Sequence, residues 1–220
     1  MSLHTPQITG PGLVEQVLPE LVTSLAHDLN NQLATMLGKP ELALILADQD
    51  RYRGALEEVV GAGHVAKSLI SDLQRLLAWL RSRPGDVSSS EVLALAVRLS
   101  RRKSDQMGVR LDPVPREGVL RFEDSAKVAL LLWKLVRMLL VAAPPEGGLW
   151  RLESRQGPAG WRMDGTFSME SSGGATRSAA GAGSIPRELV EEFQGILVEC
   201  RGGLDFAGEG HFTLDLPLDL

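Results

Sequence analysis

Apolar residues recur every three or four positions through the first third of the chain, which is the spacing of an amphipathic helix. With Leu25 as the origin of a helical wheel of about 100° per residue, six more apolar side chains fall within roughly 120°. They are Leu18, Leu21, Val22, Leu29, Leu33 and Met36. The pattern starts at Leu13 and extends to about Ala47. Inside it, Pro40 predicts a bend, and Pro19 predicts a kink unless it lies in the first turn.

The same spacing returns over residues 51–82. Because only the polar turn 48–50 separates the two helical patterns, the helices must lie antiparallel as a hairpin. A lone hairpin leaves much of its apolar stripe uncovered, and pairing two hairpins into a four-helix bundle covers it. We therefore expect a homodimer held by residues 13–83. The alternative is an ordinary helical core with no dimer.

Beyond a break at 83–86 the pattern mixes helices with strands, which predicts an α+β unit and, for the whole chain, a helical hairpin followed by an α/β sandwich. The expected elements are a helix over 91–106 with an N-cap at Ser88–Ser90, strands at 109–111 and 119–122, a helix from an Asp124 cap to Val141, strands at 150–154 and 160–167, a mobile loop over 171–184, a helix over 186–198, and strands at 202–207 and 211–217.

Composition narrows the function classes. The 220 residues allow one large domain or two small ones, and a formal net charge of −5 argues against nucleic acid as a partner. The single cysteine, Cys200, fits a reducing cytoplasm and a place in the core. Residues 1–12 should be an irregular lead-in, and the chain shows neither a membrane span nor a signal segment. The four histidines and one cysteine show no paired metal-ligand spacing.

The polar string inside the first helix carries the candidate chemistry. His27 falls roughly 160° from the centre of the apolar arc and should be exposed, with Asn31 one turn later on the same side. Asp28 sits between the two faces, and its carboxylate could fix the ring tautomer and leave the other nitrogen free to attack a phosphoryl group. The Asn31 amide could steady the phosphoryl oxygens or position a water. The alternative is a plain surface histidine, which is also how we interpret His64 and His211.

The string His-Asp-Leu-Asn-Asn-Gln-Leu, followed by Leu-Gly-Lys-Pro-Glu-Leu-Ala, resembles the phosphoacceptor box of bacterial sensor histidine kinases, in the variant common in hybrid kinases. The glycine-rich ending over 202–217 resembles the end of their ATP-binding domain. The resemblance covers residues 18–217. It implies a dimerisation and phosphotransfer hairpin over 13–83 and an ATPase-like domain over 86–220.

The resemblance fails where the kinases bind nucleotide. In that family, two asparagines precede the turn that Pro144 opens here, and one of them ligates magnesium. Lys134 and Met138 occupy those positions, and residues 130–143 contain no Asn, Asp or Glu. Magnesium requires hard oxygen ligands, which these side chains lack.

The two glycine motifs of the family's nucleotide site are also degraded. The family's Asp-x-Gly-x-Gly motif is missing after 166–170, because Asp164 and Gly165 fall inside the predicted strand. Gly181 and Gly183 echo the family's phosphate-binding turn, but linker composition explains them equally well. We therefore expect a retained fold that binds no ATP.

An intact phosphoacceptor box with an eroded ATP site resembles the histidine phosphotransferases that are built like degenerate kinases. Such proteins relay phosphoryl groups between the aspartates of response-regulator receiver domains. The resemblance makes His27 the nucleophile, Asp28 its orienting partner, and Asn31 a positioning or phosphatase residue. No cofactor is expected, with Mg²⁺ supplied by the partner receiver. The receiver would dock near His27, using Ala34, Leu37 and the facing part of the second helix.

Two alternatives remain open from the sequence. A divergent autokinase would bind ATP through unfamiliar residues. A scaffold or inhibitor would bind receivers or kinases through the bundle without any phosphorylation of His27.

Overall fold

The computed structural model describes residues 12–46, 49–82, 87–115, 125–156, 160–170, 176–178, 185–206 and 210–217. In chain order they form α1 (Leu13–Leu46), α2 (Gln49–Ser82), α3 (Ser89–Gln106), β1 (Val109–Pro115), α4 (Ser125–Val141), β2 (Gly148–Gln156), β3 (Gly160–Glu170), β4 (Thr176–Ser178), α5 (Arg187–Glu199), β5 (Gly203–Phe206) and β6 (His211–Pro217). The predicted fold class is confirmed: a helical hairpin is followed by an α+β region, residues 87–217.

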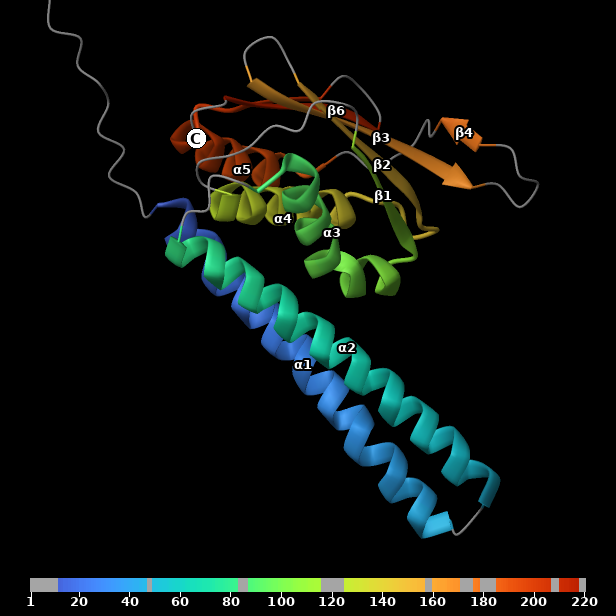
Figure 1. Cartoon of the computed structure of the whole chain (residues 1–220). Helices are drawn as coiled ribbons and strands as arrows, with labels where there is room; N and C mark the ends of the chain where they lie inside the picture. The colour runs from blue at the N-terminus through green and yellow to red at the C-terminus, as the bar shows by residue number, and fades with distance from the viewer. Residues whose placement is uncertain are drawn as a thin grey trace, which may run out of the picture.

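The long helices α1 and α2 lie side by side as the predicted antiparallel hairpin (Figure 1). The helix α1 continues through Pro19 and Pro40, with Pro19 beyond the first turn, and the bend and the kink predicted at these prolines stay predictions. Each proline costs a helix about 3 kcal/mol in isolation, and the buried Val17 and Leu21 on either side of Pro19 offset that cost by packing. The helix α2 begins at Gln49, so the predicted polar turn already belongs to it in part.

The α+β region is built on one mixed sheet with strand order β1-β2-β3-β6-β5, and the short β4 pairs with the end of β3. Strands β1 and β2 are parallel, because α4 connects them as a crossover helix, and the other pairs are antiparallel. The side chains of β6 alternate between half-buried and buried. The helices α3, α4 and α5 lie on the face of the sheet that is turned toward the hairpin (Figure 1).

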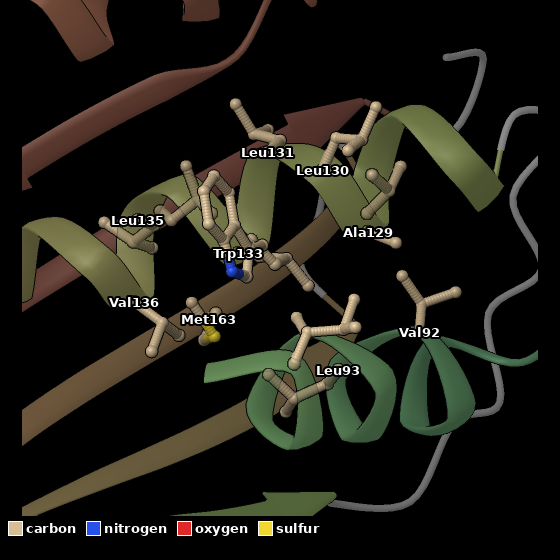
Figure 2. Close-up of a cluster of buried hydrophobic side chains, with 14 of the residues drawn as sticks. Val92, Leu93, Ala129, Leu130, Leu131, Trp133, Leu135, Val136 and Met163 are labelled. Carbon is tan, nitrogen blue, oxygen red and sulfur yellow. The ribbon is translucent and has the colours of Figure 1, made fainter. Parts of the chain in front are cut away.

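The apolar helix α4 forms the centre of the core. Thirteen of its seventeen residues are buried, because α4 is packed between the sheet, α3, α5 and the hairpin. Figure 2 shows Leu130, Trp133 and Val136 of α4 together with Leu93 of α3 and Met163 of β3. The hairpin joins this core only at the end that carries Leu13 to Leu25 of α1 and Leu76 and Trp79 of α2.

Several other predictions are settled in the described residues. The predicted N-cap is confirmed at Ser88, and the structure adds a reciprocal capping box with Glu91. The strand β4 lies within 171–184, where we expected only a loop; its three residues pair with β3, a contact that local composition does not signal. The predicted strand 119–122 and the boundary 83–86 lie outside the described residues, as does the lead-in up to residue 11. None of the described helices combines the length and the apolar character needed to cross a bilayer.

Candidate functional site

His27 lies on α1 with its side chain exposed, as the helical wheel predicted. The amide nitrogen of Asn31, one turn later, lies 3.1 Å from the imidazole Nε2. An amide nitrogen can only donate, so this contact favours the ring tautomer in which Nε2 is the acceptor and Nδ1 carries the proton. The structure therefore brings together two of the three predicted site residues, and it leaves Nε2 with the lone pair that a nucleophile needs.

Asp28 points away from the imidazole and toward α3. Its side chain is buried, and its Oδ1 lies 3.2 Å from Nε of Arg102, whose Nη1 also donates to the Asp28 backbone carbonyl at 2.7 Å. Among the described residues no hydrogen bond joins the Asp28 carboxylate to the His27 ring. Asp28 therefore ties α1 to α3, and the orienting role expected for it remains a prediction.

A cleft of about 570 Å³ opens between α1 and the α+β region at the level of His27. On one side it is lined by residues of α1, and on the other by residues of α3 and α4. The lining consists of Pro19, Glu20, Thr23, Ser24, His27, Asp28, Lys103, Gln106 and Arg137. The exposed histidine is thus not isolated on the hairpin surface, because a second wall faces it.

A charge cluster lies two turns of α1 before His27. The ammonium of Lys134 in α4 lies 2.7 Å from Glu20 of α1 and 2.7 Å from Glu192 of α5, so it joins three helices. Burial lowers the pKa of Lys134, but the hydrogen bonds to Glu192 and Glu20 outweigh that effect, and the pKa is raised above its ordinary value. The ammonium is therefore firmly protonated at neutral pH.

The residues at the kinase magnesium position do not fit a magnesium ion. Lys134 places a positive charge there, and Met138 offers a buried thioether in place of a hard oxygen. The strand position of Asp164 is also confirmed, because its carboxylate accepts from Thr213 Oγ1 at 3.0 Å and pairs with Arg155 at 2.9 Å within the sheet. The glycine pair at 181–183 lies outside the described residues.

The remaining residues singled out in the sequence lie on exposed helix surfaces, at the start of a strand or in the core. His64 is exposed on α2, His211 begins β6, and Cys200 is buried at the end of α5. Ala34 and Leu37, expected to meet a receiver domain, are exposed on α1 beyond His27.

Three cations near the site were missed by the sequence reasoning as functional elements, namely Lys103, Lys134 and Arg137. A signal for two of them was present. Lys134 and Arg137 are charged residues inside an otherwise very apolar helix, and a charge in such a helix needs a partner or a solvent-facing cleft. Lys103 lies on an already polar stretch of α3, where nothing local distinguishes it.

Comparisons with known proteins show the fold. No family model matches the chain, and no curated protein matches it significantly. A solved structure described as a bacterial phosphotransferase is 14% identical, with a TM-score of 0.56 over 90% of this chain and 94% of that chain. The Acinetobacter baumannii histidine kinase AdeS is 16% identical, with a TM-score of 0.44 over 88% and 98%. The catalytic domain of the histidine kinase ThkA is 16% identical, with a TM-score of 0.43 over 60% and 94%.

The chain therefore shares the fold of the phosphotransferase structure, and the match extends over both the hairpin and the α+β region.

Proposed function

We propose that this protein is a histidine phosphotransferase of a two-component phosphorelay, which carries phosphoryl groups between receiver-domain aspartates on His27 without ATP. The observation that carries the proposal is the state of His27: its imidazole is exposed, and its unprotonated Nε2 is held by Asn31 at 3.1 Å. A weak, solvent-exposed hydrogen bond of this kind keeps the ring oriented. It breaks at little cost when Nε2 bonds to phosphorus.

The transfer needs no ATP and only correct positioning, because the aspartyl phosphate and the phosphohistidine are both high-energy linkages. Nε2 of His27 attacks the phosphorus of an aspartyl phosphate, the N–P bond forms, the P–O bond to the aspartate breaks, and the aspartate leaves as a carboxylate. The reverse sequence on a second receiver restores the imidazole. As Nε2 engages the phosphorus, the Asn31 amide is free to donate to a phosphoryl oxygen. Magnesium belongs to the receiver in this scheme.

The Lys134 cluster supports the ATP-independent route. The protonated ammonium of Lys134 stands at the position that the sequence resemblance assigns to a magnesium-ligating asparagine, so a Mg·ATP complex would meet a positive charge there and would have to displace it from Glu20 and Glu192. This feature favours phosphotransfer over a divergent autokinase.

The apolar surface of the hairpin supports a homodimer. The half of the hairpin beyond the α+β region leaves large apolar side chains exposed, including Leu37 (65%), Leu44 (66%), Ile45 (79%) and Leu56 (63%). Pairing with a second hairpin would cover them in a four-helix bundle. We expect the double substitution Leu37→Glu and Leu56→Glu to produce a monomer with an intact α+β region. Sedimentation velocity measures the mass, and a wild-type monomer at micromolar concentration would overturn the dimer.

The function is tested by mixing the protein, without ATP, with receiver domains labelled on aspartate with ³²P and freed of their small-molecule donor. We expect label to appear on the wild-type chain within minutes for at least one receiver from the same genome. His27→Ala should take up no label and His64→Ala should behave as the wild type, because both side chains are exposed and only His27 lies in the site.

A parallel reaction with labelled ATP and magnesium separates the alternatives. Label on His27 from ATP alone would overturn the ATP-independent proposal in favour of an autokinase. Receiver binding that His27→Ala leaves unchanged, with no label transferred by any receiver, would favour a scaffold.

A further inference from the structure

The charged residues that line the cleft beside His27 divide into two groups. The two carboxylates are already paired, Glu20 with Lys134 at 2.7 Å and Asp28 with Arg102 at 3.2 Å. The two cations, Lys103 of α3 and Arg137 of α4, have no carboxylate partner among the described residues. Counted with these partners and with Glu192, which shares the Lys134 ammonium with Glu20, the groups in and beside the cleft carry an excess of one positive charge, although the whole chain has a formal net charge of −5.

The two cations are held in place without losing their charge. The Arg137 guanidinium lies 5.8 Å from the centre of the Trp133 ring, and that ring is itself buried in the core. A cation–π contact fixes the guanidinium and leaves its N–H groups free to donate. Lys103 is half-buried on α3, one residue after the Arg102 that binds Asp28, so the segment that carries it is anchored to α1.

From these contacts we infer that Lys103 and Arg137 form a phosphoryl-binding site that receives the phosphoryl group bonded to His27. The inference rests on the proposed function, because the group bound in the cleft is the phosphoryl group that His27 would carry. A phosphoryl group in transfer spreads its charge over its peripheral oxygens, and two cations that line the same cleft as the histidine would stabilise that charge. The α+β region, which lacks the magnesium ligands of the kinases, thus contributes to phosphotransfer by its side chains.

The same argument explains why the two walls of the cleft come from different parts of the chain. The hairpin supplies the nucleophile from α1, and the α+β region supplies the cations from α3 and α4. Ser24 and Thr23 of α1 add hydroxyl groups to the lining, which can donate to the remaining phosphoryl oxygens.

The test uses phosphoramidate, a small anionic donor that phosphorylates histidine directly, so that no receiver is needed. Its P–N bond breaks as Nε2 of His27 bonds to phosphorus, and ammonia leaves. Intact mass spectrometry of the full-length protein follows the rate of labelling, and His27→Ala gives the background from the other histidines.

We expect Lys103→Gln and Arg137→Gln each to slow labelling of His27 several-fold and the double variant to slow it more than about tenfold, as for the loss of charge-assisted hydrogen bonds. Lys103→Arg should restore the rate to within about twofold, because it keeps the charge. Arg137→Lys should restore the rate only in part, because it keeps the charge but loses the planar group that packs on Trp133. The matched controls are Lys67→Gln and Arg75→Gln, exposed cations of α2 that do not line the cleft, and these should label like the wild type.

A second measurement does not depend on any variant folding. Labelling of the wild type should slow as sodium chloride is raised from low to physiological concentration, because salt screens the partly solvated cations. Equal labelling rates for the wild type and the double variant, or a wild-type rate independent of salt, would overturn the inference. Neither result bears on the relay, which the receiver assay tests separately, and a receiver assay without label would leave the phosphoramidate result standing.

Discussion

Two polar clusters occupy the same helix, about two turns apart, and they are balanced in opposite ways. Around Glu20, the single ammonium of Lys134 is bound by two carboxylates, so the cation is fully engaged within the protein. Around His27, the carboxylates are bound elsewhere, and the cations Lys103 and Arg137 face an open cleft. The first cluster stands at the position that the sequence resemblance assigns to a magnesium-ligating asparagine, and the second surrounds His27, the proposed nucleophile.

The comparison shows that charge compensation distinguishes a structural polar cluster from a chemical one. A paired cluster holds helices together and has little left to offer a ligand, whereas an unpaired one must obtain its counter-charge from outside. Under the proposed function, the Lys134 cluster is structural, and the cations Lys103 and Arg137 serve the phosphoryl group on His27.

Breaking the Arg102 and Asp28 pair should have the largest effect. Arg102→Met leaves a buried carboxylate without its partner, and we expect the free energy of unfolding to fall by about 3 kcal/mol. Asp28→Asn should cost less, because a neutral amide is cheaper to leave buried. Guanidinium denaturation measures both, and equal stabilities for Arg102→Met and the wild type would contradict the prediction.

Lys134→Met should lower the free energy of unfolding by about 2 kcal/mol. The effect is smaller because Glu20 and Glu192 are about half exposed and can be hydrated once the lysine is gone. Labelling of His27 by phosphoramidate should slow less than in the Lys103 and Arg137 double variant, because Lys134 does not line the cleft and acts there only through its partner Glu20. The control is Lys67→Met, which removes an exposed lysine from α2 and should leave stability unaltered.

Alkaline pH should remove the contribution of Lys134 to the free energy of unfolding of the wild type. Because the pKa of Lys134 is raised in the folded state, its stabilisation is fully present below the unfolded value of about 10.4 and is lost as the pH rises through the folded value. The difference in unfolding free energy between the wild type and Lys134→Met should therefore stay constant up to about pH 10 and shrink above it. A difference that instead grew with pH would show that the lysine is not stabilised as an ammonium.

Asn31→Ala should have the smallest effect, on rate and not on stability. The lost hydrogen bond to Nε2 is exposed, so the free energy of unfolding should change by less than about 0.5 kcal/mol. Labelling of His27 should slow about threefold, because the ring loses its orientation and the phosphoryl oxygens lose a donor. Asn31→Asp is a useful comparison, since its negative charge would repel the phosphoryl group and slow labelling further.

The sequence was sufficient for the features that depend on local spacing. The exposure of His27, its i+4 contact with Asn31 and the N-cap at Ser88 follow from helix geometry alone. The contacts of Asp28 could not be predicted in this way, because its partner Arg102 lies 74 residues away on another helix. The same is true of the cleft itself, whose cations reach His27 only through the packing of α3 and α4 against α1.

Contacts between distant segments also determine two features that composition does not indicate, namely the formation of β4 and the exposure of part of the apolar arc on α1. The strand β4 forms in a glycine- and serine-rich stretch because the end of β3 offers an unpaired edge. On α1, Val22 and Leu33 belong to the predicted apolar arc but are exposed in the single chain, since α2 covers only part of that arc. Their exposure agrees with the proposed dimer without demonstrating it.

The two arginines one turn apart on α3 have a consequence for molecular recognition. Arg98 binds Asp72 of α2 at 2.9 Å, and Arg102 binds Asp28 of α1, so α3 is attached to both helices of the hairpin. The hairpin and the α+β region therefore present a composite surface in a single arrangement before any partner arrives. The rotational freedom that a hinged region would lose on binding is already lost during folding, so a partner that contacts both parts binds to a preorganised surface.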